Sequence, residues 1–363
     1  MGASSLAACA RRGASTIGFD RYERGHALGA SSGKTRLIRQ AYFENPAYVP
    51  LLLRAYELWA QLERETQQRL LYDTGLLMVG RPESGLIRGS LQSSDEFALP
   101  VELWNAPHLR YKFPQLRVLD TEVGVYERAG GALIPERAVN AYLILAQQSG
   151  AQMRFEARLM HWHADGAGVT LHFEDGSRIR ARRLILALGP WMDAALEALG
   201  IPLVVQRNVQ AWFAPGARGY SAGDFPSFLL ERDGYPAILY GFPDLGDGVK
   251  AAFHKLGTPG PPDAVDRAID LERDVEPVRA ALNAWMPDAA KTFLDAKVCM
   301  YALTPDEHFV IDAHPEHRNV VILGGFSGHG FKFASVAGEI AAQLALDGGT
   351  ENSIGFLSIR RFR

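Results

Sequence analysis

The chain has 363 residues, 47% hydrophobic and 22% charged, which excludes the disordered, collagen-like and coiled-coil classes. Its 38 basic and 41 acidic residues leave a net charge of −3, so the excess of positive charge typical of nucleic-acid-binding proteins is absent. Two cysteines exclude a disulfide scaffold and no apolar run approaches the roughly 18 residues of a membrane span, so we expect a cytoplasmic protein without membrane or nucleic-acid partners.

The beginning of the chain predicts part of a βαβ unit. Residues 4–12 form a helical pattern ending at Gly13, and residues 16–19 form a short strand closed by Asp20. A βαβ unit normally has a strand and a glycine-rich turn before its helix, with that strand at the centre of the sheet. We therefore expect the central strand to be missing, with Gly2 standing as the last glycine of the turn.

The remaining elements alternate between helical and extended patterns. Asn45 and Pro46 have the form of an N-cap and first helical position of a long amphipathic helix. Short runs between Gly and Pro predict a β-rich region over 76–131. The other expected helices are 136–149, 264–285 and 334–346, and the other extended stretches are 153–188, 204–254, 297–311 and 319–323.

A glycine-rich turn over 324–330 is the most informative local motif. Its four glycines within seven residues let backbone N–H groups approach a flat or anionic ligand, although an ordinary strand-to-helix turn stays an alternative. A serine-hydrolase elbow is excluded, because the motif needs glycine where His329 stands. A phosphate loop over 29–35 is one residue too short. His161 and His163 lack a third ligand at metal-site spacing, so we expect no metal site.

Five blocks of residues, in order along the chain, together resemble one protein family. The blocks are 33–42, 240–243, Lys250 with His254, 299–312 and 325–333. They resemble the monomeric sarcosine oxidase and N-methyltryptophan oxidase family, from about Gly2 to the C-terminus. The resemblance implies an α/β (α+β mixed) flavoprotein, in which a glutathione-reductase-like Rossmann domain for FAD is interleaved with a β-sheet substrate domain. The implied FAD domain is 1–70, 135–205 and 300–363, and the implied substrate domain is 71–134 and 206–299.

The resemblance also implies roles for single residues. Taken alone, Cys299 in its apolar run indicates a buried, inert thiol, but in the family its counterpart is bonded covalently to the flavin. Arg39 and Lys332 would hold the substrate carboxylate, and Lys250 would stand where oxygen is reduced. Asp20 would bind the adenosine ribose and Arg36 would lie against the flavin, while Tyr240, His254 and Tyr301 would line the substrate pocket. The further cofactor contacts expected are Gly2, Ser32, Thr35, Gly189, Trp191, Gly325, Gly328, Gly330, Phe331 and, again, Lys332.

The implied reaction is oxidation of the secondary amine of an N-methyl amino acid, of the sarcosine or N-methyl-L-tryptophan type. Water hydrolyses the imine to formaldehyde and the primary amino acid, and O2 is reduced to hydrogen peroxide. We expect a monomer. Two alternatives stay open: a truncated, non-catalytic relative with an impaired FAD site, and a flavin dehydrogenase that passes electrons to a partner.

Overall fold

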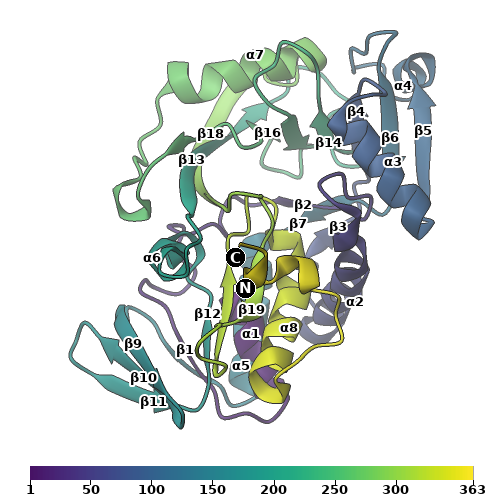
Figure 1. The fold of residues 1–363 in the computed structure, drawn as a ribbon. Helices are drawn as coiled ribbons and strands as arrows, with labels where there is room; N and C mark the ends of the chain where they lie inside the picture. The colour runs from purple at the N-terminus through teal and green to yellow at the C-terminus, as the bar shows by residue number, and fades with distance from the viewer. Residues whose placement is uncertain (363) are drawn as a thin grey trace.

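The largest sheet combines two separated stretches of the chain in the computed structural model, which describes residues 1–362. Nine strands follow the order β17-β13-β16-β15-β14-β4-β6-β5, with β18 paired to β13 (Figure 1). The parallel pair of β4 and β14, in register at Leu77 and Phe228, joins the two stretches. The strands are β4 Leu76–Gly80, β5 Val101–Asn105, β6 Val123–Glu127, β13 Val204–Ala214, β14 Ser227–Leu230, β15 Leu239–Phe242, β16 Val249–Phe253, β17 Thr258–Pro259 and β18 Thr292–Leu303.

Two expectations for this part of the chain are wrong. The stretch 76–131 contains two helices, α3 Gly85–Phe97 and α4 Ala106–Lys112. Both begin at a capping side chain, because Ser84 accepts a hydrogen bond from the amide of Ile87 and Asn105 accepts one from the amide of His108. The helix expected over 264–285 is also shorter. A π-helical turn at Leu271–Val275 leads into α7 Glu276–Trp285, whose first turn contains proline.

Four smaller sheets complete the fold, and two of them form the centre of a second region, below the nine-stranded sheet in Figure 1. β1 pairs in parallel with β8, and β12 pairs in parallel with β20, which continues to β19. Within residues 1–362, β1 and β12 each have one edge without a partner strand. The elements are α1 Gly2–Arg11, β1 Ile17–Phe19, α5 Pro135–Gln148, β8 Gln152–Arg154, β12 Leu184–Leu186, β19 Val310–Ala313, β20 Val320–Gly324 and α8 Ala334–Asp347.

Helix α1 bridges these two sheets of the second region. It packs against α5 and α8 and contacts both β1 and β12. Gly18 of β1 lies directly under Leu6, so close that a Cβ there would come within 2.8 Å of the leucine side chain. The other end of α1 reaches β12, since a Cβ on Gly2 would lie 3.7 Å from Ala187. One face of α1 therefore spans the space between the unpaired edges.

The remaining elements flank these sheets. The cap formed by Asn45 serves a short 3-10 turn, Pro46–Tyr48, and the long helix begins only at Val49, later than expected. His161 lies on β9 and stacks on His172 with ring centroids 4.3 Å apart; the described residues contain no cluster of ligands able to hold a metal ion. None of the helices within residues 1–362 is long and apolar enough to cross a membrane. These elements are α2 Val49–Thr66, α6 Asp193–Glu197, and strands β2 Arg36–Ile38, β3 Leu71–Tyr72, β7 Gly131–Leu133, β9 Leu159–Asp165, β10 Gly168–Phe173 and β11 Arg178–Ala181.

Candidate flavin and substrate site

A cavity of about 1270 Å³ extends from α1, β1 and β12 to residues of the nine-stranded sheet. Its volume exceeds the roughly 300–1000 Å³ of a pocket for one small ligand, as an elongated dinucleotide requires. It brings together residues that are far apart in the sequence. The expected site residues in its wall are Gly2, Asp20, Arg36, Arg39, Gly189, Trp191, Tyr240, His254, Cys299, Tyr301, Gly325, Gly328, Phe331 and Lys332. Four other expected residues are not in the wall: Ser32, Thr35, Lys250 and Gly330.

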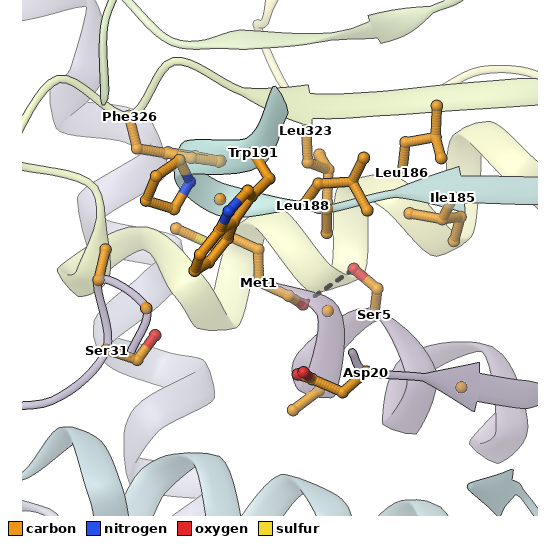
Figure 2. A pocket seen from close by; sticks show the side chains of 18 of the residues that line it. Met1, Ser5, Asp20, Ser31, Ile185, Leu186, Leu188, Trp191, Leu323 and Phe326 are labelled. Carbon is orange, nitrogen blue, oxygen red and sulfur yellow. Dashed lines mark hydrogen bonds between the residues drawn. The ribbon is translucent and has the colours of Figure 1, made fainter. Parts of the chain in front are cut away.

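One end of the cavity lies beside α1 and Asp20 (Figure 2). Asp20 directly follows β1, and its carboxylate accepts a hydrogen bond of 2.9 Å from the amide of Tyr22. Trp191 follows the tight turn at Gly189, whose φ is +59°. Its indole nitrogen donates to Asp263 over 2.6 Å, so a side chain from the loop after β17 holds this wall. An acidic group and an aromatic plane thus meet at this end.

The opposite end contains Cys299 and Arg36. Cys299 lies on β18 and is only 3% exposed, with its sulfur 3.5 Å from a guanidinium nitrogen of Arg36. The guanidinium also donates to the carbonyl oxygens of Ala30, Ser32 and Thr35, which fixes its position. Burial alone would lower the pKa of Arg36, but the surrounding groups, Cys299 foremost, raise it. A permanent positive charge therefore stands beside the sulfur of Cys299.

Arg39 already has an ionic partner, which sequence reasoning missed. One of its terminal nitrogens donates to both oxygens of Glu44, over 2.6 and 2.5 Å. The Nε atom of Arg39 is buried with no hydrogen-bond partner among the described residues. Burial tends to raise the pKa of Glu44, but Arg39 and Lys332 lower it below its usual range. The Glu44 carboxylate, in the cavity wall, is therefore ionised at neutral pH.

Lys332 approaches the same wall from the C-terminal part of the chain. Its ammonium donates to the carbonyl of His329 over 2.7 Å, and no carboxylate of the described residues lies within ion-pair distance. Burial and the nearby Arg39 lower the pKa of Lys332 well below that of an ordinary lysine. An anion bound in the cavity would counter both effects.

The glycine-rich turn is shaped by close approaches. Gly325 and Gly328 have φ values of +59° and +77°, and a Cβ on either would come within 2.3 Å of Thr304 or Tyr301, respectively. These two positions therefore require glycine. His329 joins the turn to its surroundings. Its Nε2 faces the carbonyl of Glu307 over 3.0 Å and its Nδ1 lies 2.5 Å from the hydroxyl of Tyr42. Burial lowers the pKa of His329, so the neutral ring donates from Nε2 and accepts the tyrosine hydroxyl at Nδ1.

Lys250 lies behind the cavity wall. Its ammonium donates to the carbonyls of Gly33 and Thr35, over 2.6 and 2.9 Å, and to the Thr35 hydroxyl over 3.2 Å. The residue is 2% exposed, and burial and Arg36 lower its pKa well below the ordinary lysine value. Lys250 is thus an electrostatic neighbour of Arg36 and Cys299 and supports the loop that shapes this end of the cavity.

Comparisons with known proteins agree with this arrangement. A family model described as DAO, FAD dependent oxidoreductase, matches residues 1–344. The chain is 39% identical to a monomeric sarcosine oxidase of Streptomyces avermitilis, over 99% of this chain and 95% of that protein. The chain belongs to the FAD-dependent oxidoreductases. Within that family, it is also 33% identical to an N-methyl-L-tryptophan oxidase of Salmonella dublin, over 95% of this chain and 93% of that protein. The predicted resemblance to the monomeric sarcosine oxidase and N-methyltryptophan oxidase family is confirmed.

The fold of this FAD-dependent oxidoreductase is shared with solved structures. The open form of NikD, an unusual amino acid oxidase essential for nikkomycin biosynthesis, has a TM-score of 0.85 at 23% identity, covering 98% of this chain and 94% of that one. L-proline dehydrogenase from P. horikoshii also has a TM-score of 0.85, at 21% identity, with 99% and 94% covered. These likenesses confirm the predicted α/β class and FAD-type fold.

The residues of the cavity suit an FAD molecule. The long cavity offers a carboxylate, Asp20, at one end, as a ribose requires, and a cationic wall with Cys299 at the other. Asp20, Trp191, Arg36, Cys299 and the 325–331 turn would hold the cofactor.

Proposed function

We propose that this oxidoreductase oxidises the secondary amine of an N-methyl amino acid, with O2 as the electron acceptor. The products are formaldehyde, the primary amino acid and hydrogen peroxide. The observation that carries the proposal is the convergence of Arg39 and Lys332, two buried cations from opposite ends of the chain, on the cavity wall that also contains Cys299. Buried cations without enough counter-charge mark the place where an anionic group binds.

The side chains of this wall position the substrate. Arg39 and Lys332 bind the carboxylate through charge-assisted hydrogen bonds, which fixes one end of the molecule. Tyr240, His254 and Tyr301 surround the other end, with the ring centroids of His254 and Tyr301 5.6 Å apart. Burial lowers the pKa of His254 well below its usual value, so the ring is neutral and does not repel a protonated amine. FAD, when bound, accepts the two electrons that the substrate loses as its C–N single bond becomes the C=N bond of the imine.

The two regions of the fold divide these tasks. The stretches 1–70, 135–205 and 300–363 would hold FAD, and the stretches 71–134 and 206–299 would form the substrate domain. The nine-stranded sheet supports this division, because its strands come almost entirely from the latter two stretches. Tyr240 and His254 then reach the cavity from the substrate side, and Lys332 from the cofactor side.

Cys299 would attach the cofactor covalently through the flavin 8α-methyl carbon. A sulfur–carbon bond replaces the thiol S–H bond and one methyl C–H bond, and two electrons and two protons pass to O2. The Arg36 guanidinium, 3.5 Å from the sulfur, supports the thiolate that forms this bond. In acid-precipitated protein, the yellow colour should stay in the pellet for wild type and move to the supernatant for Cys299→Ser. Flavin released by wild-type protein would contradict the attachment.

A product assay tests the reaction itself. Protein loaded with FAD should form formaldehyde and hydrogen peroxide in equal amounts from N-methylglycine or from N-methyl-L-tryptophan, and none from N,N,N-trimethylglycine, which lacks an N–H group. Arg39→Met should reduce kcat/KM roughly a hundredfold, because the carboxylate loses its charge-assisted bonds. Formaldehyde without peroxide, and only with an added electron acceptor, would instead identify a dehydrogenase. Gel filtration of the same preparation checks the expected monomer.

A further inference from the structure

Glu44 stands in the cavity wall between the groups that would bind the substrate carboxylate. It lies five residues after Arg39, and both its oxygens accept from one terminal nitrogen of that guanidinium. Its side chain is 11% exposed and that of Arg39 is 3% exposed. The Coulombic partners that lower the pKa of Glu44 are Arg39, Lys332 and, more weakly, His254. Glu44 is therefore close enough to Arg39, Lys332 and His254 to interact with all three.

Three charged groups at the substrate end, Arg39, Glu44 and Lys332, leave a balance of one positive charge, whereas Arg36 in the same cavity interacts instead with Cys299. Arg39 and Glu44 neutralise each other, and Lys332 has no carboxylate partner of its own among the described residues. A second buried carboxyl group, Glu127, is turned away from the cavity, because its oxygens accept from the backbone amides of Gln40 and Ala41. A ligand with a single carboxylate matches this balance, whereas a ligand with two would exceed it.

We propose that Glu44 is a specificity-determining residue, which restricts the site to ligands with one carboxylate by opposing a second negative charge. The substrate class, N-methyl amino acids with one carboxylate, rests on the function proposed above. Glu44 occupies one terminal nitrogen of Arg39 and leaves the other terminal nitrogen of the guanidinium to the ligand. A second carboxylate entering the wall would meet the Glu44 oxygens, and like charges placed side by side in a buried site repel strongly.

A pair of ligands that differ in charge but hardly in shape tests this inference. Malonamate has one carboxylate and one neutral amide, and malonate has two carboxylates. Neither can be oxidised as an amine, so binding is measured by the change in the flavin absorbance spectrum and by the shift in the thermal midpoint. Wild-type protein should bind malonamate at least about tenfold more tightly than malonate. Equal affinity of wild-type protein for the two ligands would overturn the proposal without any variant.

Three variants separate charge from structure. Glu44→Gln keeps an oxygen that accepts from Arg39 and removes the charge, so the preference for malonamate should fall about tenfold or more. Glu44→Asp keeps the charge and should keep the preference. Glu122→Gln is the matched control, because Glu122 is a buried carboxylate paired with Arg232 over 2.6 and 2.8 Å, outside the cavity wall. It should leave the preference unchanged even if the thermal midpoint falls.

Two outcomes with Glu44→Gln decide the result. A shift of the malonamate-to-malonate ratio supports the proposal, whereas an equal loss of affinity for both ligands would show that Glu44 only holds Arg39 in place. Turnover gives a second readout: kcat/KM for iminodiacetate relative to N-methylglycine should rise in Glu44→Gln. If neither amine is oxidised while the binding ratio shifts as expected, the proposed reaction fails and the role of Glu44 stands.

Discussion

The two regions on either side of the cavity differ in how fully other parts of the chain cover their strands. In the nine-stranded sheet the neighbouring strands β4 and β14 are buried along their whole length, and Leu77 and Phe228 on them are fully buried. On the cofactor side, β1 and β12 each have an edge that no strand of the described residues covers, and both line the cavity. The centre of the first region is therefore covered by protein on all sides. The second has backbone and apolar surface whose partner is a ligand or another segment.

This difference indicates which side supplies rigidity. Cys299 and Tyr301 lie on β18, which pairs with β13 along almost its whole length. The sheet therefore holds both residues in fixed positions at the cavity. The cofactor side contributes turns, 20–36 and 325–332, whose positions depend on side-chain hydrogen bonds such as those that Glu136 accepts from the amides of Gly33 and Lys34. Functional groups placed on rigid strands need less support from the ligand than groups placed on turns.

Two matched leucine substitutions, one in each region, test whether the regions differ in packing. Leu77→Ala, in the fully buried β4, should lower the free energy of unfolding by about 2–5 kcal/mol, because it leaves a cavity in a packed sheet. Leu184→Ala, in half-buried β12 beside the existing cavity, should cost less than about 1.5 kcal/mol. Denaturant titration without added FAD measures both. Equal losses would mean that the cofactor side is packed as tightly as the sheet.

Lys250 connects the two regions, because it lies on β16 and donates to the loop at Gly33 and Thr35. Its charge, with that of Arg36, would favour the reduction of O2 to superoxide at this end of the cavity. Lys250→Met should slow the reoxidation of the flavin by O2 roughly a hundredfold and change its reduction by substrate far less. Stopped-flow traces of the two half-reactions measure this. Equal slowing of both would assign Lys250 to the positioning of the loop alone.

The pH dependence of reoxidation sharpens this prediction. Burial and Arg36 lower the pKa of Lys250, so its ammonium loses the proton at a lower pH than an ordinary lysine does. Since the charged form favours superoxide, the reoxidation rate should fall as the pH rises through that lowered pKa. Measurements from about pH 6 to 10 should show the fall in wild type and a flat profile in Lys250→Met. A fall that persists in the variant would belong to another group.

Most residues that the family resemblance pointed to line one cavity, whereas two helices near it were not expected from the sequence. Arg39, Cys299 and Lys332 lie in one cavity wall. They could be found in the sequence because each lies in a short block of residues that resembles the family. Glu44 was missed, since an isolated acidic residue between Phe43 and Asn45 has no signature until the fold places it against Arg39. Helices α3 and α4 were missed for a different reason. In α3, Ser90, Ser93 and Ser94 take buried positions where a helical pattern has apolar residues, although the caps Ser84 and Asn105, with Pro107 after the latter, were available signals.

The smallest effect expected concerns the unpaired edges of β1 and β12. An apolar segment of about six residues, joined by a glycine-rich turn ahead of Met1, could pair with these edges and pack under α1, which already spans them through Leu6 and Gly2. Each strand–strand pairing formed would satisfy backbone groups that now border the cavity. We expect the thermal midpoint to rise by several degrees and more FAD to remain bound after gel filtration. A matched segment with two prolines, which cannot complete the hydrogen-bond ladder, should give neither gain. If both segments act alike, or neither changes the protein, the backbone groups at the edges of β1 and β12 need no further strand. The two regions would then not differ in how fully their strands are covered.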